Sequence, residues 1–272
     1  MDIDPDITLH YLQGVESHRL TTWGRLEAVR TRELLARYLP PAPATVLDVG
    51  GAEGAYALPL AAQGYSVHLV DPVTTHVEAA RRASDAQPTA PLASASVGDA
   101  RQLDAPDGSV DAVLLLGPLY HLVEAEDRSR ALLEAFRVLR PGGVLVAAAI
   151  SRFASSLDGV RTGAIADPRF ESIVEGDLRD GVHRNPDVEG HPEWFTLAFL
   201  HTPTLLGDEV RASGFSDAAV LAVEGVGAWM DLDTVLDEPV GRAAVLRAIG
   251  RLEREPSLLG SSPHLLAVAH RP

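Results

Sequence analysis

Glycine and aspartate residues follow one another here at a spacing that suits nucleotide binding. The stretch TVLDVGGAEGAYALPLAAQGYSVHLVDPV (residues 45–73) is an apolar run, a turn with Gly50, Gly51 and Gly54, a helical segment and a second apolar run that ends at Asp71. Glycines in such a turn let a ligand approach the backbone, whose N–H groups can then bind it. A carboxylate after the second run can accept both hydroxyls of a ribose. The pattern predicts a nucleoside site that suits NAD, FAD or S-adenosylmethionine.

The residues of the turn narrow this choice. A dinucleotide fingerprint, G-x-G-x-x-G, would need glycines at positions 50, 52 and 55, but Ala52 and Ala55 occupy two of them. Asp48, at the end of the first run, would repel a pyrophosphate and would attract an ammonium group. The α-amino group and the sulfonium of S-adenosylmethionine suit this acidic turn, so we expect that cofactor.

Four segments of the chain resemble, in the same order, the successive motifs of one enzyme family. VLDVGGAEG (46–54), VHLVDP (67–72), GDARQL (98–103) and EAFRVLRPGGVLV (134–146) are similar to successive motifs of the class I S-adenosylmethionine-dependent methyltransferases. The resemblance covers about residues 9–150. In the first motif, usually D-x-G-x-G-x-G, Ala52 replaces the middle glycine, and we expect Gly51 to supply the flexibility instead.

The resemblance implies a set of cofactor contacts and a fold. Asp71 would bind the ribose and Asp99 and Ala100 the adenine. The N-terminal segment looks like a bacterial branch that acts on small molecules or peptides, whose first helices close over the cofactor with Tyr11 or Arg19 near its methionine carboxylate. The full expected cofactor set is Tyr11, Arg19, Asp48, Gly50, Gly51, Gly54, Asp71, Pro72, Asp99, Ala100 and Leu116.

The loop GPLYHL (117–122) lies where the methyl group should emerge. Methyl transfer is an in-line displacement at an activated carbon, so the protein mainly positions the acceptor and excludes water. Tyr120 and His121 are the expected catalytic residues, because they could orient or deprotonate an acceptor. The alternative is that both only pack beneath a cap.

The expected cap is an insertion that gathers aromatic and cationic groups, GVHRNPDVEGHPEWFTLAFLHTP (181–203). Such a lid could enclose a planar substrate, and an arginine could pair with a substrate carboxylate. The expected substrate contacts are Tyr120, His183, Arg184, His191, Trp194 and Phe195. The alternative is an irregular loop whose Trp and Phe anchor it to the core. His183 and His191 lack a third ligand at metal spacing, so we expect no metal site.

The elements that must position these residues alternate between strand and helix. We expect strands at 45–49, 66–70, 93–97, 111–116 and 143–150 and helices near 54–63, 74–84 and 125–139, followed by a helix from Pro203, an extended run at 215–224, a helix at 227–256 and a strand at 264–271. A helix over 18–39 should precede them. Strands that are apolar at every position indicate helices on both sheet faces.

This alternation predicts an α/β fold with a doubly wound, Rossmann-like sheet. The resemblance implies seven strands, the last antiparallel. We expect an N-terminal helical cap (1–43), a cofactor-binding core (44–150), a cap insertion (151–202) and a C-terminal completion of the core (203–272).

Composition excludes several partners. The 272 residues carry a formal net charge of −15 and no cysteine, and every basic residue other than histidine is arginine. Nucleic-acid binding needs a basic face, and Schiff-base or P-loop chemistry needs lysine. With no apolar run long enough to span a membrane and no signal sequence, a cytoplasmic location is expected. The rival interpretations are an NAD(P)-dependent oxidoreductase and a non-catalytic methyltransferase-like binding domain.

Overall fold

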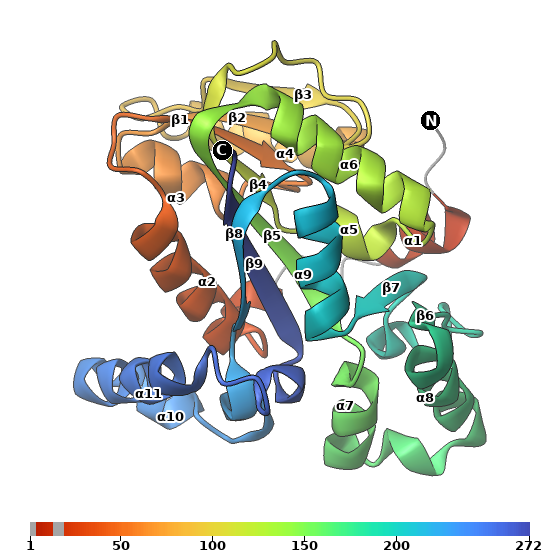
Figure 1. Cartoon of the computed structure of the whole chain (residues 1–272). Helices are drawn as coiled ribbons and strands as arrows, with labels where there is room; N and C mark the ends of the chain where they lie inside the picture. The colour runs from red at the N-terminus through yellow and green to blue at the C-terminus, as the bar shows by residue number, and fades with distance from the viewer. Residues whose placement is uncertain (1–3, 13–18) are drawn as a thin grey trace.

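A mostly parallel sheet organises the computed structural model, which describes residues 4–12 and 19–272 (Figure 1). Five parallel strands lie in the order β3-β2-β1-β4-β5. Their bounds are Thr45–Val49 (β1), Ser66–Asp71 (β2), Ser94–Val97 (β3), Val110–Leu115 (β4) and Leu139–Ser151 (β5). Every residue of β4 is buried, because helices cover both faces of the sheet at its centre.

Two further strands complete the sheet beyond β5. β9 (His264–His270) pairs antiparallel with β5, and β8 (Ser216–Ala222) pairs antiparallel with β9. β8 therefore runs in the same direction as the five parallel strands and ends at the same edge. The predicted doubly wound fold with an antiparallel last strand is confirmed.

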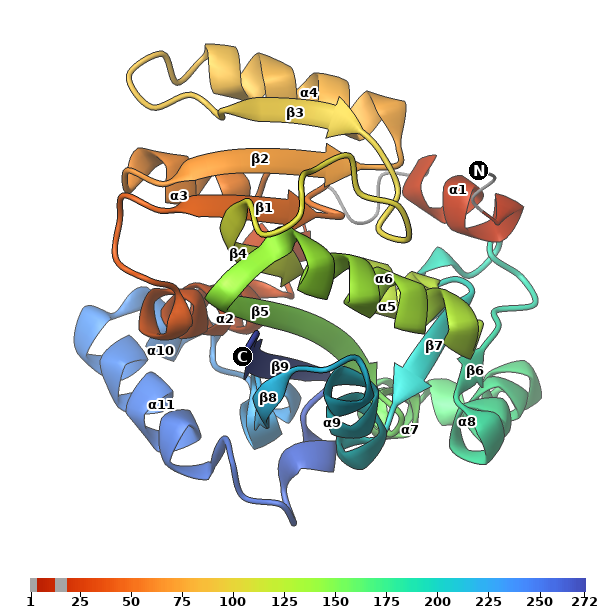
Figure 2. The ribbon, with the colours of Figure 1, turned by 45° about the horizontal axis from the view of Figure 1, so that its top comes forward.

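Two hydrophobic layers hold the helices against the sheet. One face packs on α5 (Pro118–His121), α6 (Ala125–Val138) and α9 (Pro203–Ala212). The other packs on α2 (Arg25–Tyr38), α3 (Ala57–Ala62) and α4 (Thr74–Asp85). Figure 2 shows β1, β2 and β3 pointing toward the edge where α1 (Pro5–Leu12) lies. The loops that follow these three strands therefore lie at the same edge of the sheet as α1.

The insertion after β5 adds strands that the seven-strand expectation did not include. It contains α7 (Ala154–Thr162), a short 3-10 turn η2 (Ala164–Ala166), α8 (Pro168–Asp180), β6 (Val182–His183), a second turn η3 (Pro192–Trp194) and β7 (Ala198–His201). β7 pairs in parallel with the end of β5, and β6 pairs antiparallel with β7. The described residues thus form nine strands, because the insertion extends the sheet.

Two expected helices are shorter than predicted. The helix expected over 18–39 begins only at Arg25, because the chain makes a turn in which the N–H groups of Thr22 and Gly24 both bond to the carbonyl of Arg19. The helix expected over 227–256 is divided into η4 (Gly225–Trp229), α10 (Asp233–Asp237) and α11 (Pro239–Leu252). Pro239 starts α11, as expected of a residue without an N–H donor. η5 (Leu259–Ser261) precedes β9.

The described residues include no helix that is long and apolar enough to cross a membrane.

Candidate active site

The glycine turn after β1 adopts a left-handed backbone at three positions. The φ angles are +72° at Gly50, +46° at Ala52 and +93° at Gly54. The expectation that Gly51 supplies the flexibility is wrong, since Ala52, and not Gly51, takes a positive φ in this turn. Gly51 serves close packing instead, because a Cβ there would lie 2.8 Å from Oδ2 of Asp48 and 2.9 Å from Cδ1 of Leu69.

Asp48 is a buried carboxylate beneath this turn. It is 1% exposed, and neither of its oxygens hydrogen-bonds to another described residue. Burial, followed by the nearby charge of Asp71, raises the pKa of Asp48 to about 7. A buried carboxylate without a partner is costly, so this position favours a cationic group from a ligand.

Asp71 joins the end of β2 to the glycine turn. Its Oδ2 accepts the N–H of Ala52 at 2.9 Å, and its Oδ1 accepts the N–H of Val73 at 2.9 Å and contacts Nδ1 of His76 at 3.1 Å. A carboxylate offers about four lone-pair sites. One site on Oδ2 is therefore left for a further donor such as a ribose hydroxyl.

Asp99, expected at the adenine, is engaged by Arg101. Its Oδ1 accepts the backbone N–H and Nε–H of Arg101, and its Oδ2 accepts from Nη2 at 2.8 Å. Burial alone would raise the pKa of Asp99, but these hydrogen bonds outweigh it and lower the pKa. Ala100, beside it, is buried, whereas Pro72 after β2 is exposed and Leu116 after β4 is half-buried.

The two expected catalytic residues lie in a cluster of rings. The hydroxyl of Tyr11 is hydrogen-bonded to Nε2 of His121 at 2.8 Å. The ring of Tyr120 lies 4.7 Å from that of His121, and the ring of Phe195 lies 5.9 Å from it. His76 contacts Tyr11 from α4, with ring centroids 5.6 Å apart. Helices α1, α4 and α5 and the insertion thus meet at one place.

Phe195 is held in a strained backbone conformation. Its φ is +67° and its ψ −160°, which is rare for a residue with a side chain. The buried Asn185 donates from Nδ2 to the carbonyls of Phe195 and His191, at 2.9 and 2.8 Å. Strain of about 1–3 kcal/mol persists where the surroundings enforce it, most often at functional sites. Here it turns the ring toward His10 and His121.

The other expected substrate residues lie elsewhere in the insertion. His183 is buried, with Nδ1 at 3.0 Å from the Asp177 carboxylate and Nε2 at 2.8 Å from the carbonyl of Trp194. Trp194 packs in a small core with Phe170 and stacks on His191 at 3.9 Å. Arg184 is exposed. Of the expected set, Tyr120 and Phe195 join the ring cluster around His121, and the ring of His183 reaches it only through Phe195, at 6.2 Å between centroids.

Arg19 lies in a charged group that the sequence did not indicate. It pairs with Glu27, whose Oε2 is 3.6 Å from Nδ1 of His264, and this ring also bonds to Glu224 at 2.5 Å. Burial would lower the pKa of His264, but the Glu27 and Glu224 carboxylates raise it to about 9. The side chains of Glu27, Glu224 and His264 lie close enough together to hold a metal ion. Arg19 and a protonated His264, however, already neutralise the two carboxylates.

Sequence reasoning missed His10, His76, Glu27, Glu224 and His264. The sequence does give an indication for His76, because this residue lies in the first turn of the helix that follows the candidate ribose ligand Asp71. The other four come from segments far apart in the chain, and only the fold brings them to this edge of the sheet.

Comparisons with known proteins agree with this geometry. A family model described as a methyltransferase domain matches residues 47–147. An uncharacterized methyltransferase of Mycobacterium tuberculosis is 38% identical over 107 residues, which are 39% of this chain and 40% of the relative. The demethylmenaquinone methyltransferase of Deinococcus radiodurans is 29% identical over 205 residues, which are 73% of this chain and 79% of the relative. The chain thus matches about two fifths of the length of the mycobacterial relative.

A solved structure extends the likeness of the fold to almost the whole chain. The S-adenosylmethionine-dependent methyltransferase of Thermotoga maritima, described as a possible histamine N-methyltransferase, covers 98% of both chains with a TM-score of 0.58 and 18% identity. The strand order, the turn after β1 and the matched domain lead to one assignment. Residues 47–147 match a methyltransferase domain, and nearly the whole chain has the fold of the S-adenosylmethionine-dependent methyltransferases.

Proposed function

We propose that the chain transfers a methyl group from S-adenosylmethionine to an oxygen or nitrogen atom of a small molecule or a modified peptide, releasing S-adenosylhomocysteine. The observation that carries this proposal is the unpartnered, buried Asp48 carboxylate beside the left-handed turn. A cofactor with an ammonium group fits that site, whereas a pyrophosphate would be repelled. An NAD(P)-dependent oxidoreductase is therefore the weaker interpretation.

In this proposal, three carboxylates each contact a different part of the cofactor. Asp48 pairs with the ammonium group, and the unused lone pair of Asp71 Oδ2 accepts a ribose hydroxyl. Asp99 and Ala100 face the adenine, with Arg101 holding the Asp99 carboxylate in place. When bound, S-adenosylmethionine supplies an activated methyl group. The protein then has to place the acceptor in line and exclude water.

His121 and Tyr120 are proposed to orient the acceptor. His121 is hydrogen-bonded through Nε2 to Tyr11, which fixes the ring, and it can take a proton if the acceptor is a phenol, an alcohol or an ammonium group. An acceptor that is already ionised needs only the positioning. Tyr120 and Phe195 would provide apolar surface around the acceptor.

The ring cluster supports a planar acceptor. Aromatic side chains from α1, α5 and the insertion come together at one place, and flat apolar rings prefer edge or offset contacts with such groups. The name of the Deinococcus relative, a demethylmenaquinone methyltransferase, is compatible with such an acceptor. The exposed Arg184 could pair with an acidic group at the rim of the site.

The transfer reaction can be tested with S-adenosylmethionine carrying a radiolabelled methyl group. The purified chain would be incubated with demethylmenaquinone, with a phenol and amine panel, and with extract from its own cells. Label in an organic product is expected, and its rate of incorporation should fall about a hundredfold or more in the His121→Asn variant. Binding of the cofactor without label in any fraction would favour a non-catalytic binding domain instead.

A further inference from the structure

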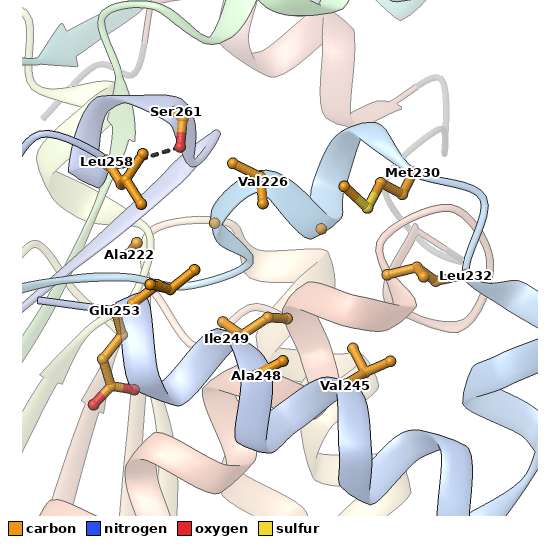
Figure 3. A pocket seen from close by; sticks show the side chains of 13 residues that line it. Ala222, Val226, Met230, Leu232, Val245, Ala248, Ile249, Glu253, Leu258 and Ser261 are labelled. Atoms are coloured by element: carbon orange, nitrogen blue, oxygen red, sulfur yellow. Dashed lines mark hydrogen bonds between the residues drawn. The ribbon is translucent and has the colours of Figure 1, made fainter. Parts of the chain in front are cut away.

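A pocket of about 240 Å³ lies outside the ring cluster, between η4, α11 and η5 (Figure 3). Val226 and Met230 line it from η4 and the residue after it, and Val245 and Ile249 from α11. Neither the glycine turn nor the catalytic candidates contribute to this lining. The pocket therefore needs an explanation of its own.

The polar groups of the lining are already engaged. The Glu253 carboxylate accepts from Nη2 of Arg30 at 2.7 Å and also pairs with Arg37. The hydroxyl of Ser261 donates to the carbonyl of Leu258 at 2.6 Å, as the dashed line in Figure 3 shows. A charged or strongly polar ligand would lose its hydration here without gaining a partner among these lining side chains.

The size of the pocket limits the ligand. An engineered apolar cavity of about 150 Å³ binds benzene, so a pocket of about 240 Å³ has room for a two-ring aromatic group or a short alkyl chain. Its mouth is accessible, because Val226, Met230 and Leu252 are 38%, 60% and 46% exposed. Large apolar side chains gathered at one exposed mouth are typical of ligand-binding surfaces.

The pocket lies on the same edge of the sheet as the glycine turn. Ala222, which lines it, ends β8, and β8 runs in the same direction as β1, β4 and β5. Leu26 of α2 packs with Ile249 of the lining, while the next residue, Glu27, faces His264. Two adjacent residues of α2 thus contact the pocket lining and the charged group, respectively.

We propose that this pocket is a binding site for an uncharged apolar group of about two-ring size. The group is either the apolar part of the methyl acceptor or a separate apolar ligand. The inference does not require the proposed function, because the pocket is complete without the cofactor residues.

The neutral dye N-phenyl-1-naphthylamine provides a test, since its fluorescence rises in apolar surroundings. Saturable binding to the full chain is expected, with competition by naphthalene and by n-octanol. Ala248 lines the pocket from α11, so Ala248→Phe should fill it and weaken dye binding at least about tenfold. Ala244→Phe is the matched control, because Ala244 is exposed on the same helix outside the lining. Its dye affinity should stay within about twofold of the parent.

Parallel measurements separate the possible outcomes. Equal thermal unfolding of both variants would show that Ala248→Phe is folded, and titration of S-adenosylhomocysteine tests the cofactor site independently. No saturable dye binding, or equal binding by both variants, would overturn the pocket proposal even if the cofactor binds. If demethylmenaquinone is methylated, a higher KM in Ala248→Phe alone assigns the pocket to the acceptor. An unchanged KM with lost dye binding assigns it to a separate ligand.

Discussion

The Tyr11 hydroxyl lies 2.8 Å from Nε2 of His121 and is hydrogen-bonded to it. This contact joins the first helix of the chain to α5, which follows β4. The resemblance implied that Tyr11 lies near the methionine carboxylate of the cofactor. The structure shows that its hydroxyl also contacts a candidate catalytic residue, and its place near the methionine carboxylate stays a prediction.

Removing that hydroxyl should slow methyl transfer without disturbing the cofactor. Tyr11→Phe is expected to lower kcat about tenfold, since His121 loses the bond that fixes its ring. His121→Asn should lower it by about a hundredfold or more, the range of general acid–base effects. Affinity for S-adenosylhomocysteine should remain within about twofold in both. Tyr38→Phe, at a tyrosine whose hydroxyl accepts from Arg254, is the control and should keep full activity. Full activity of His121→Asn would remove His121 from the mechanism.

Asp71→Ala should weaken cofactor binding more than tenfold. The variant loses the acceptor for a ribose hydroxyl and also the bond that holds the N–H of Ala52 in the turn. Calorimetric titration with S-adenosylhomocysteine measures the change. Asp85→Ala, at an exposed position on α4, is the matched control. Unchanged affinity in Asp71→Ala would mean that the ribose is bound elsewhere.

Cofactor affinity should depend on pH through Asp48. In the ligand-free protein the pKa of Asp48 is about 7, because the carboxylate is buried and lies near Asp71. A bound ammonium group favours the ionised form, so binding releases a proton when the pH is at or below that value. Affinity for S-adenosylhomocysteine should therefore rise several-fold between about pH 6 and pH 8 and then level off.

The isosteric Asp48→Asn variant should bind more weakly and lose this pH dependence. Calorimetry in two buffers with different ionisation enthalpies would detect the released proton directly. A parent protein that shows no proton release near pH 6.5 would place the ammonium group away from Asp48.

The stability of the fold should fall at alkaline pH through His264. Burial lowers the pKa of this imidazole, but Glu27 and Glu224 outweigh it and raise the pKa to about 9, above its ordinary value of 6.5. The stabilisation is complete below about pH 6.5 and is lost as the pH rises through about 9. Thermal unfolding at pH 6 to 10 should show a decline in Tm that His264→Gln reduces. His270→Gln, at the exposed far end of β9, should leave the decline unchanged.

The fold was predictable wherever the sequence pattern has a local cause. Apolar runs bounded by glycine and proline located β1, β2, β4 and β5, and the most continuous of these runs belongs to β4, which is buried on both faces. The expected C-terminal helix is divided, and its last part begins at Pro239. Hydrophobic periodicity alone does not reveal this effect of proline. The strands β6 and β7 are too short for alternation to reveal them.

The candidate site was predictable in part for the same reason. Asp48 and Asp71 lie at strand ends that the pattern identified, and the turn between them joins consecutive elements. The contacts of Arg19 with Glu27 and of Tyr11 with His121 depend on how distant segments pack. His183 and Trp194 share a short segment with Phe195, yet they support the insertion through Asp177 and Phe170 while only Phe195 turns toward His121. The residue types in this segment do not show which side chains support the insertion and which one turns toward His121.

The most direct test of the account is calorimetric titration of the purified chain with S-adenosylhomocysteine, beside a matched titration with NADH. We predict micromolar binding of S-adenosylhomocysteine and no binding of NADH, as the unpartnered Asp48 carboxylate and the turn at Ala52 require. Binding of NADH in preference to S-adenosylhomocysteine would contradict the assigned cofactor.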